Sequence, residues 1–139
     1  MNASKIIKGL VTFVFLGVLS FATTRSRADV LTQDAALKMM TKSGCAVCHA
    51  IDKMKIGPAY KDVAARYAAP TPEVKAYLKD QAPADYLFTK VRTGSKPGVN
   101  KNWIKSPEGK PYGLMTPNLP ARINDADLKA LIAFILSLK

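Results

Sequence analysis

Two cysteines and the single histidine of the chain lie together, as Cys45, Cys48 and His49. Their spacing is C-x-x-C-H, the pattern through which c-type haem is attached to protein. Two thiols about one helical turn apart can each form a thioether with one vinyl group of the same porphyrin. The adjacent imidazole can then bind the iron as its fifth ligand. The motif therefore predicts one covalently bound haem c, with Cys45 and Cys48 as attachment sites and His49 as an iron ligand.

Three other interpretations of these cysteines explain less. A thioredoxin-like C-x-x-C motif is expected near a βαβ pattern, which the sequence lacks. A structural zinc site needs four ligands, and the chain has only three Cys and His residues in total. A disulfide, the common state of a cysteine pair in an exported protein, leaves His49 without a role.

Helical periodicity surrounds the motif. We expect a helix capped by Thr32 and ended by Gly44, directly before the first cysteine. A second helix is expected over residues 59–67, with Pro58 near its first position. The apolar stripe of the first helix is expected to comprise Ala36, Leu37 and Met40.

The rest of the chain predicts further helices and one long loop. We expect Thr71 to cap a helix whose inward face comprises Val74, Tyr77 and Leu78. Pro83 interrupts this helical pattern, and another helix is expected over residues 85–93. Residues 95–120 are rich in proline and glycine and predict a loop, long enough to need a function such as covering a haem face. No run alternates as a strand does, so the fold class is all-α. The final helix is capped by Asn124 and carries the stripe Leu128, Leu131, Ile132, Ile135 and Leu136.

The first 28 residues have the pattern of a signal peptide. Lys5 and Lys8 precede an uncharged apolar run over residues 9–24, and Ser26-Arg27-Ala28 forms a small-x-small cleavage site. The apolar run is shorter than the roughly 20 residues of a spanning helix. We expect residues 1–28 to be cleaved and residues 29–139 to form one periplasmic haem domain; the alternative is a membrane anchor made by an uncleaved N-terminus.

The predicted mature domain is basic. Residues 1–28 contain four of the 21 Lys and Arg and none of the 10 Asp and Glu, so residues 29–139 have a net charge of +7. This charge favours redox partners with acidic docking patches and transient contact with membrane complexes. Export argues against a nucleic-acid partner, and we expect a monomer.

The chain resembles the class I c-type cytochromes, and most of all their short bacterial monohaem members associated with denitrification and respiration. The resemblance is carried by residues 44–52, 56–64, 94–95, 115–118 and 135–139. It implies a small fold of about four to five helices wrapped around one covalently bound haem. It also implies a single-electron carrier rather than an enzyme, cycling between Fe(III) and Fe(II).

The resemblance implies further site residues. It implies that Met115 is the axial iron ligand opposite His49. It also implies that the Pro58 carbonyl accepts a hydrogen bond from the other ring N–H of His49, and that Asn118 contacts the sulfur of Met115. Lys90 and Trp103 fall where the family anchors a haem propionate.

Elimination among the methionines agrees with Met115. Met39 and Met40 lie in the helix before the motif, and Met54 lies five residues after His49, so none easily reaches the far face of a porphyrin. Met115 lies far along the chain, in the proline-rich loop.

The sequence also departs from the family pattern. Thr116 follows Met115 where the family usually has proline, and extra residues occur around 71–82 and 104–113. Trp103 lies twelve residues before Met115, farther than in the family. If Met115 is not a ligand, the alternative is a haem enzyme or gas-binding sensor with an open sixth site.

The leader can be tested directly. We expect the exported protein to begin at Asp29, because cleavage follows the small-x-small site at Ala28. Intact-mass measurement of protein from the periplasmic fraction checks this. Recovery of the chain with Met1 in the membrane fraction would instead support the anchored form.

Overall fold

A computed structural model describes residues 30–95 and 112–139, and every regular element in these two ranges is a helix. No strand occurs among them, so the predicted all-α class is confirmed. Five helices have seven or more residues, and the sixth is a single turn. In chain order they are α1 (Gln33–Lys42), α2 (Cys45–Cys48), α3 (Tyr60–Ala68), α4 (Pro72–Leu78), α5 (Pro83–Thr93) and α6 (Asp125–Ser137).

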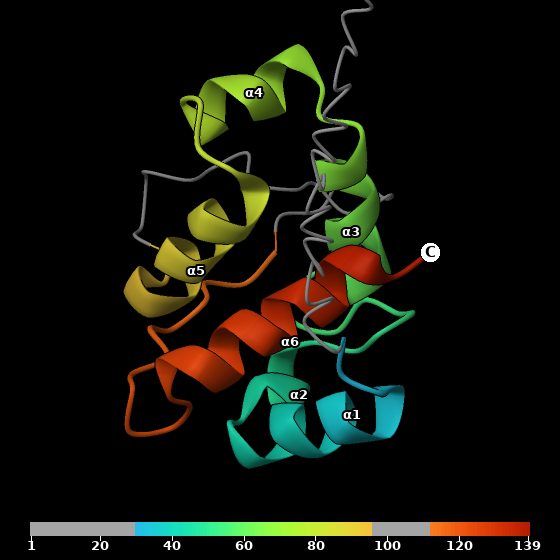
Figure 1. The fold of residues 1–139 in the computed structure, drawn as a ribbon, viewed down its shortest axis with the longest axis vertical. Coiled ribbons are helices and arrows are strands. Elements are labelled where there is room, and N and C mark those ends of the chain that lie inside the picture. The colour runs from blue at the N-terminus through green and yellow to red at the C-terminus, as the bar shows by residue number, and fades with distance from the viewer. Residues whose placement is uncertain (1–29, 96–111) are drawn as a thin grey trace, which may run out of the picture.

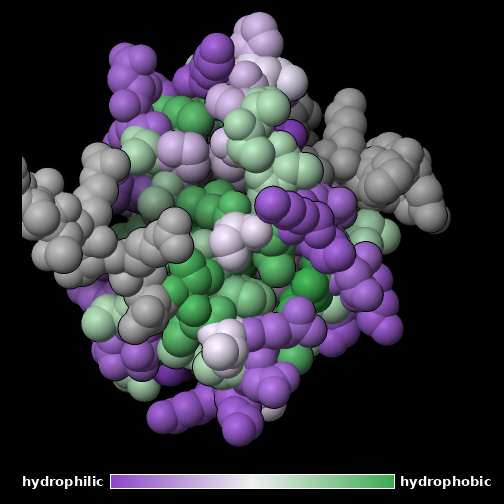
Figure 2. All heavy atoms as spheres, turned by 45° about the vertical axis from the view of Figure 1, so that its right-hand side comes forward, coloured by the Kyte–Doolittle hydropathy of each residue, from purple (hydrophilic) through white to green (hydrophobic). Residues whose placement is uncertain are grey.

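The C-terminal helix α6 is the centre of the packing. It contacts α3, α5 and α1, while α1 also packs on α2 (Figure 1). Four residues of its predicted apolar stripe are buried, namely Leu128, Leu131, Ile132 and Ile135, while the fifth, Leu136, is half-buried. Phe134 is buried in addition. Apolar side chains gather in the middle of one face of the molecule and hydrophilic ones surround them (Figure 2). Helix α6 therefore provides the largest share of the core.

The predicted helix caps are confirmed. A side-chain oxygen at the N-cap accepts a hydrogen bond from a backbone N–H of the first turn, which satisfies a donor that the helix leaves free. The three pairs are Thr32 with Ala35 N at 3.3 Å, Thr71 with Val74 N at 3.3 Å and Asn124 with Asp127 N at 2.8 Å.

Three details of the sequence-based prediction were wrong. Helix α3 begins at Tyr60, because Ala59 stays extended while the Tyr60 N–H bonds the Ala50 carbonyl at 2.9 Å. Pro83 starts α5 instead of interrupting a helix, since proline suits the first helical turn. Leu37, placed in the apolar stripe of α1, is 40% exposed.

The described part of the proline-rich loop, residues 112–119, contains no helix, as predicted. Trp103 lies outside the described residues, and so does the predicted signal peptide. Across residues 30–95 and 112–139, none of the helices has both the length and the apolar character that crossing a membrane requires.

Candidate haem-binding site

The two cysteines lie on the single turn α2. Gly44, with φ at +79°, ends α1 and caps α2, and the His49 N–H donates to the Cys45 carbonyl at 3.0 Å to close the turn. Cys45 and Cys48 are half-buried and not joined to each other. The residues described include no cluster of three or more Cys, His, Asp or Glu that could hold a metal ion. Both thiols are therefore available on one helical turn, as thioether attachment requires.

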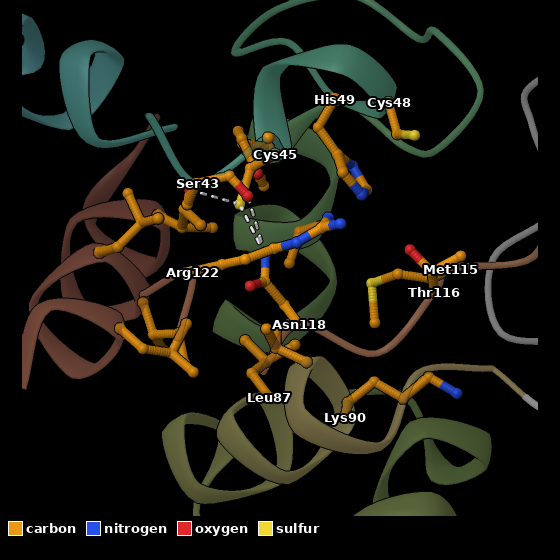
Figure 3. A pocket seen from close by; sticks show the side chains of 18 of the residues that line it. Ser43, Cys45, Cys48, His49, Leu87, Lys90, Met115, Thr116, Asn118 and Arg122 are labelled. Carbon is orange, nitrogen blue, oxygen red and sulfur yellow. Dashed lines mark hydrogen bonds between the residues drawn. The ribbon is translucent and has the colours of Figure 1, made fainter. Parts of the chain in front are cut away.

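His49 leaves the turn with extended backbone, which directs its ring into a cavity (Figure 3). Its Nδ1 lies 2.8 Å from the Pro58 carbonyl oxygen, as the resemblance implied. Burial lowers the pKa of the imidazole, and the hydrogen bond to Pro58 opposes this only in part. The neutral ring thus donates through Nδ1–H and leaves the lone pair of Nε2 free for a metal ion.

Gly57 and Tyr60 hold the His49 ring from its sides. A Cβ at Gly57 would lie 2.5 Å from the ring carbon Cε1, so only glycine allows this approach. The Tyr60 ring stacks on the imidazole, with centroids 5.0 Å apart and planes 17° from parallel. Burial, and then the nearby Cys45 and Cys48 thiols, raise the pKa of the Tyr60 phenol well above its ordinary value, so this ring stays neutral.

The cavity beside His49 has walls that are mostly apolar. It contains about 910 Å³ of atom-free space, part of it open to solvent. Its apolar walls come from α3, α5 and α6, with Val63, Leu87, Val91, Leu128, Leu131, Ile132 and Ile135. A smaller hollow of about 360 Å³ adjoins it and shares Cys48, His49, Lys90 and Met115 in its lining.

Met115 enters the same cavity from another part of the chain. It belongs to residues 112–123, which we call the Met115 segment. The thioether of Met115 and the imidazole of His49 point into the cavity from different segments (Figure 3). The Met115 carbonyl accepts a hydrogen bond from Ser95 N at 2.8 Å, just after α5. Gly94 has φ at +68°, and a Cβ there would lie 2.6 Å from the Met115 oxygen, so glycine is required for this contact too.

Asn118 also lines the cavity, but its amide group bonds elsewhere. Its Nδ2 donates to the Ser43 carbonyl at 3.3 Å and lies 3.7 Å from the Cys45 sulfur, while Oδ1 is buried without a hydrogen-bond partner. The implied contact between Asn118 and the sulfur of Met115 is therefore not among the hydrogen bonds of this structure. That role stays a prediction.

Lys90 and Tyr112 place unpaired polar atoms at the smaller hollow. Lys90 is only 6% exposed, and its Nζ has no hydrogen-bond partner; the buried Tyr112 hydroxyl has none either. Both residues line this hollow, and no Asp or Glu is among the described residues that line it. Burial lowers the pKa of the Lys90 ammonium group. Because unpaired buried charge is costly, the pair fits a ligand that brings its own negative charge.

Sequence reasoning missed four residues of the site: Ser43, Tyr60, Tyr112 and Arg122. The Ser43 hydroxyl lies 3.1 Å from the Cys45 sulfur, and the Arg122 guanidinium extends into the cavity (Figure 3). Tyr112 carried the one usable signal, an aromatic hydroxyl three residues before Met115. The other three occupy ordinary helix or turn positions, so only the fold brings them to the cavity.

The residues present fit a haem. The cavity presents apolar walls to a planar macrocycle, two free thiols to its vinyl groups and a neutral imidazole to its iron. Lys90 and Tyr112 offer donors without partners to its carboxylates.

The comparisons with known proteins point the same way. The family model described as Cytochrome c matches residues 34–139. Cytochrome c-551 of Allochromatium vinosum is 41% identical over 104 residues, which cover 75% of this chain and 86% of that protein. Cytochrome c-552 of Nitrosomonas europaea is 40% identical over 98 residues, covering 70% and 73%.

A solved structure of wild-type cytochrome c552 from Nitrosomonas europaea also superposes on the chain. The TM-score is 0.51 at 36% sequence identity, and the alignment covers 74% of this chain and 99% of that one. The match of fold, motif and sequence shows that this chain belongs to the cytochrome c family, as a small class I bacterial monohaem member that carries one covalently bound haem c.

Proposed function

We propose that the protein is a single-electron carrier whose iron is bound by His49 and Met115. The observation that carries this proposal is that both side chains point into one apolar cavity beside the two free thiols (Figure 3). When bound, the haem supplies a one-electron Fe(III)/Fe(II) couple. With two protein ligands the iron has no vacant position for a substrate, so the proposed role is electron transfer and not catalysis.

The residues around the iron tune this couple. Pro58 accepts the Nδ1–H of His49, which fixes the tautomer and strengthens Nε2 as a donor. A thioether from Met115 raises the reduction potential relative to a second nitrogen ligand. The apolar walls act in the same direction, because a low dielectric disfavours the extra positive charge of the ferric state.

The proposed partners and compartment follow from charge and the leader pattern. A net charge of +7 on residues 29–139 favours redox proteins with acidic docking patches and accelerates their encounter at low salt. We propose that the protein acts in the periplasm as a monomer, after removal of residues 1–28.

The first prediction concerns covalent attachment. Each thioether needs its own thiol, so Cys45→Ala and Cys48→Ala should each lose one link, and the double variant should lose covalent haem altogether. The measurement is extraction of the denatured protein with acid and organic solvent, followed by mass spectrometry of the chain. Free extraction of haem from the wild-type protein would contradict the attachment.

The second prediction concerns the sixth ligand. The ferric wild-type protein should show a sulfur-to-iron charge-transfer band that is lost in Met115→Ala. Removing the thioether should also lower the reduction potential and let carbon monoxide bind the ferrous iron. Visible spectroscopy, potentiometric titration and carbon monoxide binding measure these three changes.

Two other methionines serve as controls for that experiment. Met40 is 1% exposed in the core and Met54 is 41% exposed in a loop, so Met40→Leu and Met54→Leu should both keep the band. Lys101 and Lys110, which lie outside the described residues, are the competing ligands to test if the band is absent from wild type. Ready binding of carbon monoxide by the wild-type protein would favour the haem enzyme or gas-binding sensor instead.

We further propose that Lys90 and Tyr112 bind a haem propionate, with Tyr112 in the role that the sequence suggested for Trp103. Their polar atoms are buried, lack partners and line one hollow next to His49 and Met115. An ammonium group and a phenol are both donors, which suits a carboxylate. Asp62 raises the pKa of Tyr112 in addition to burial, so this phenol stays protonated as a donor.

The third prediction separates Tyr112 from Trp103. Tyr112→Phe removes one donor to a carboxylate and should raise the pKa of a propionate by about one unit. Lys90→Gln should raise it by about one to three units, and Lys90→Arg should restore it. The pKa is read from infrared spectra of holoprotein with isotopically labelled propionates.

Matched variants complete that experiment. Tyr77→Phe removes a hydroxyl that bonds Glu73 on the surface of α4, so it should not shift the propionate pKa. A shift in Trp103→Phe with none in Tyr112→Phe would return the role to Trp103.

A further inference from the structure

Arg92, near the end of α5, holds the Met115 segment through two backbone carbonyls. Its Nη1 donates to the Asn118 oxygen at 2.8 Å and its Nη2 to the Ile123 oxygen at 3.0 Å. These contacts join residues 26 and 31 positions apart in the sequence. One guanidinium thus fixes the Met115 segment at two points, after the proposed ligand and before α6.

The surroundings of Arg92 fix the guanidinium itself. Nη2 also bonds the Asp125 carboxylate at 2.6 Å, and the guanidinium lies 5.3 Å from the centre of the Phe88 ring. The Arg92 side chain is only 14% exposed, whereas Asp125 is 65% exposed. The exposed ion pair is worth little by itself, so the carbonyl contacts are the main role of the side chain. A lysine keeps the charge but not the planar fork that serves both carbonyls.

The Met115 segment needs such an anchor because it has no helix of its own over residues 112–119. Asn118 lies three positions after Met115, and its N–H bonds the Val91 carbonyl at 2.9 Å. The backbone N–H and the backbone carbonyl of Asn118 are therefore both bonded to α5, through Val91 and Arg92. Movement of Asn118 away from α5 would carry the thioether of Met115 away from the cavity.

We infer that Arg92 is a positioning residue for Met115, which slows the departure of the sixth ligand from the iron by fixing Asn118 and Ile123 to α5. This inference rests on the proposed ligation by Met115. It adds to the proposed iron ligands a supporting residue that does not line the cavity and that no sequence motif marks. Arg92 acts through the backbone and touches neither iron nor haem.

The test measures how fast an external ligand replaces Met115 in the ferric holoprotein. At high imidazole concentration, the rate of loss of the sulfur-to-iron band reaches a plateau equal to the rate at which the thioether leaves. Arg92→Lys loses two hydrogen bonds to carbonyls and should raise the plateau rate about tenfold. Hydrogen–deuterium exchange should rise in the Met115 segment of the same variant.

Three controls distinguish positioning from a general loss of stability. Thr71→Ala removes the cap of α4, a comparable loss of stability at a distant helix, and should leave the plateau rate unchanged. Lys129→Gln removes the other cation near the Phe88 ring, at 5.6 Å, and should also leave it unchanged. Asp125→Asn keeps both carbonyl contacts and should change the rate less than about threefold.

The outcomes separate this inference from the proposed function. An unchanged plateau rate in Arg92→Lys, or an equal rise in Thr71→Ala or Asp125→Asn, would overturn the positioning role while Met115 remains the ligand. Absence of the sulfur-to-iron band from the wild-type protein would overturn ligation by Met115 itself.

Discussion

The apolar cavity between α3, α5 and α6 is the constraint on which the rest of the structure depends. Each of these helices turns apolar side chains toward a space that the protein itself does not fill. A domain of this size buries a modest core and gains stability from any further apolar contact. A haem provides this contact, and its attachment to α2 keeps it at the site. The cofactor is thus part of the hydrophobic core as well as the redox centre.

Two short irregular segments bring the polar chemistry to this apolar space. The turn after α2 directs His49 inward and supplies the Pro58 carbonyl, and the close contact at Gly57 leaves no room for a side chain there. The Met115 segment approaches from α5, where Gly94 allows an equally close contact. Helices form the walls because they satisfy their own backbone groups, whereas the proposed ligands His49 and Met115 come from segments held by specific hydrogen bonds.

The distribution of charge inside the site differs from that on the surface. The surface of the domain carries many lysines, and exposed charges of this kind affect encounter with partners more than the fold. Lys90 is different, because its ammonium group is buried and unpaired in the described structure. In the proposed function, a haem propionate supplies the anion that pairs with it. Arg92, in contrast, donates hydrogen bonds to the backbone carbonyls of Asn118 and Ile123 and so holds the Met115 segment against α5.

The sequence by itself determined the cofactor, its attachment residues and most helices. Cys45, Cys48 and His49 are adjacent in the chain, so their chemistry depends on local spacing alone. Helix caps such as Thr32 and Asn124, and the stripe of α6, are likewise local patterns with a period of 3.6 residues. A detail was wrong where a contact between separate segments outweighed local preference: α3 begins at Tyr60, whose N–H bonds the Ala50 carbonyl.

Only the tertiary structure decided which distant residues meet at the cavity. Tyr112 lies at the smaller hollow and Arg122 extends into the cavity, and both places depend on contacts across the fold. Arg92 does not line the cavity, but it bonds carbonyls 26 and 31 residues away and so holds the segment that does. A backbone carbonyl is present at every residue, so no residue type marks it as a partner. Such contacts follow from where chain segments pack, which one sequence does not reveal.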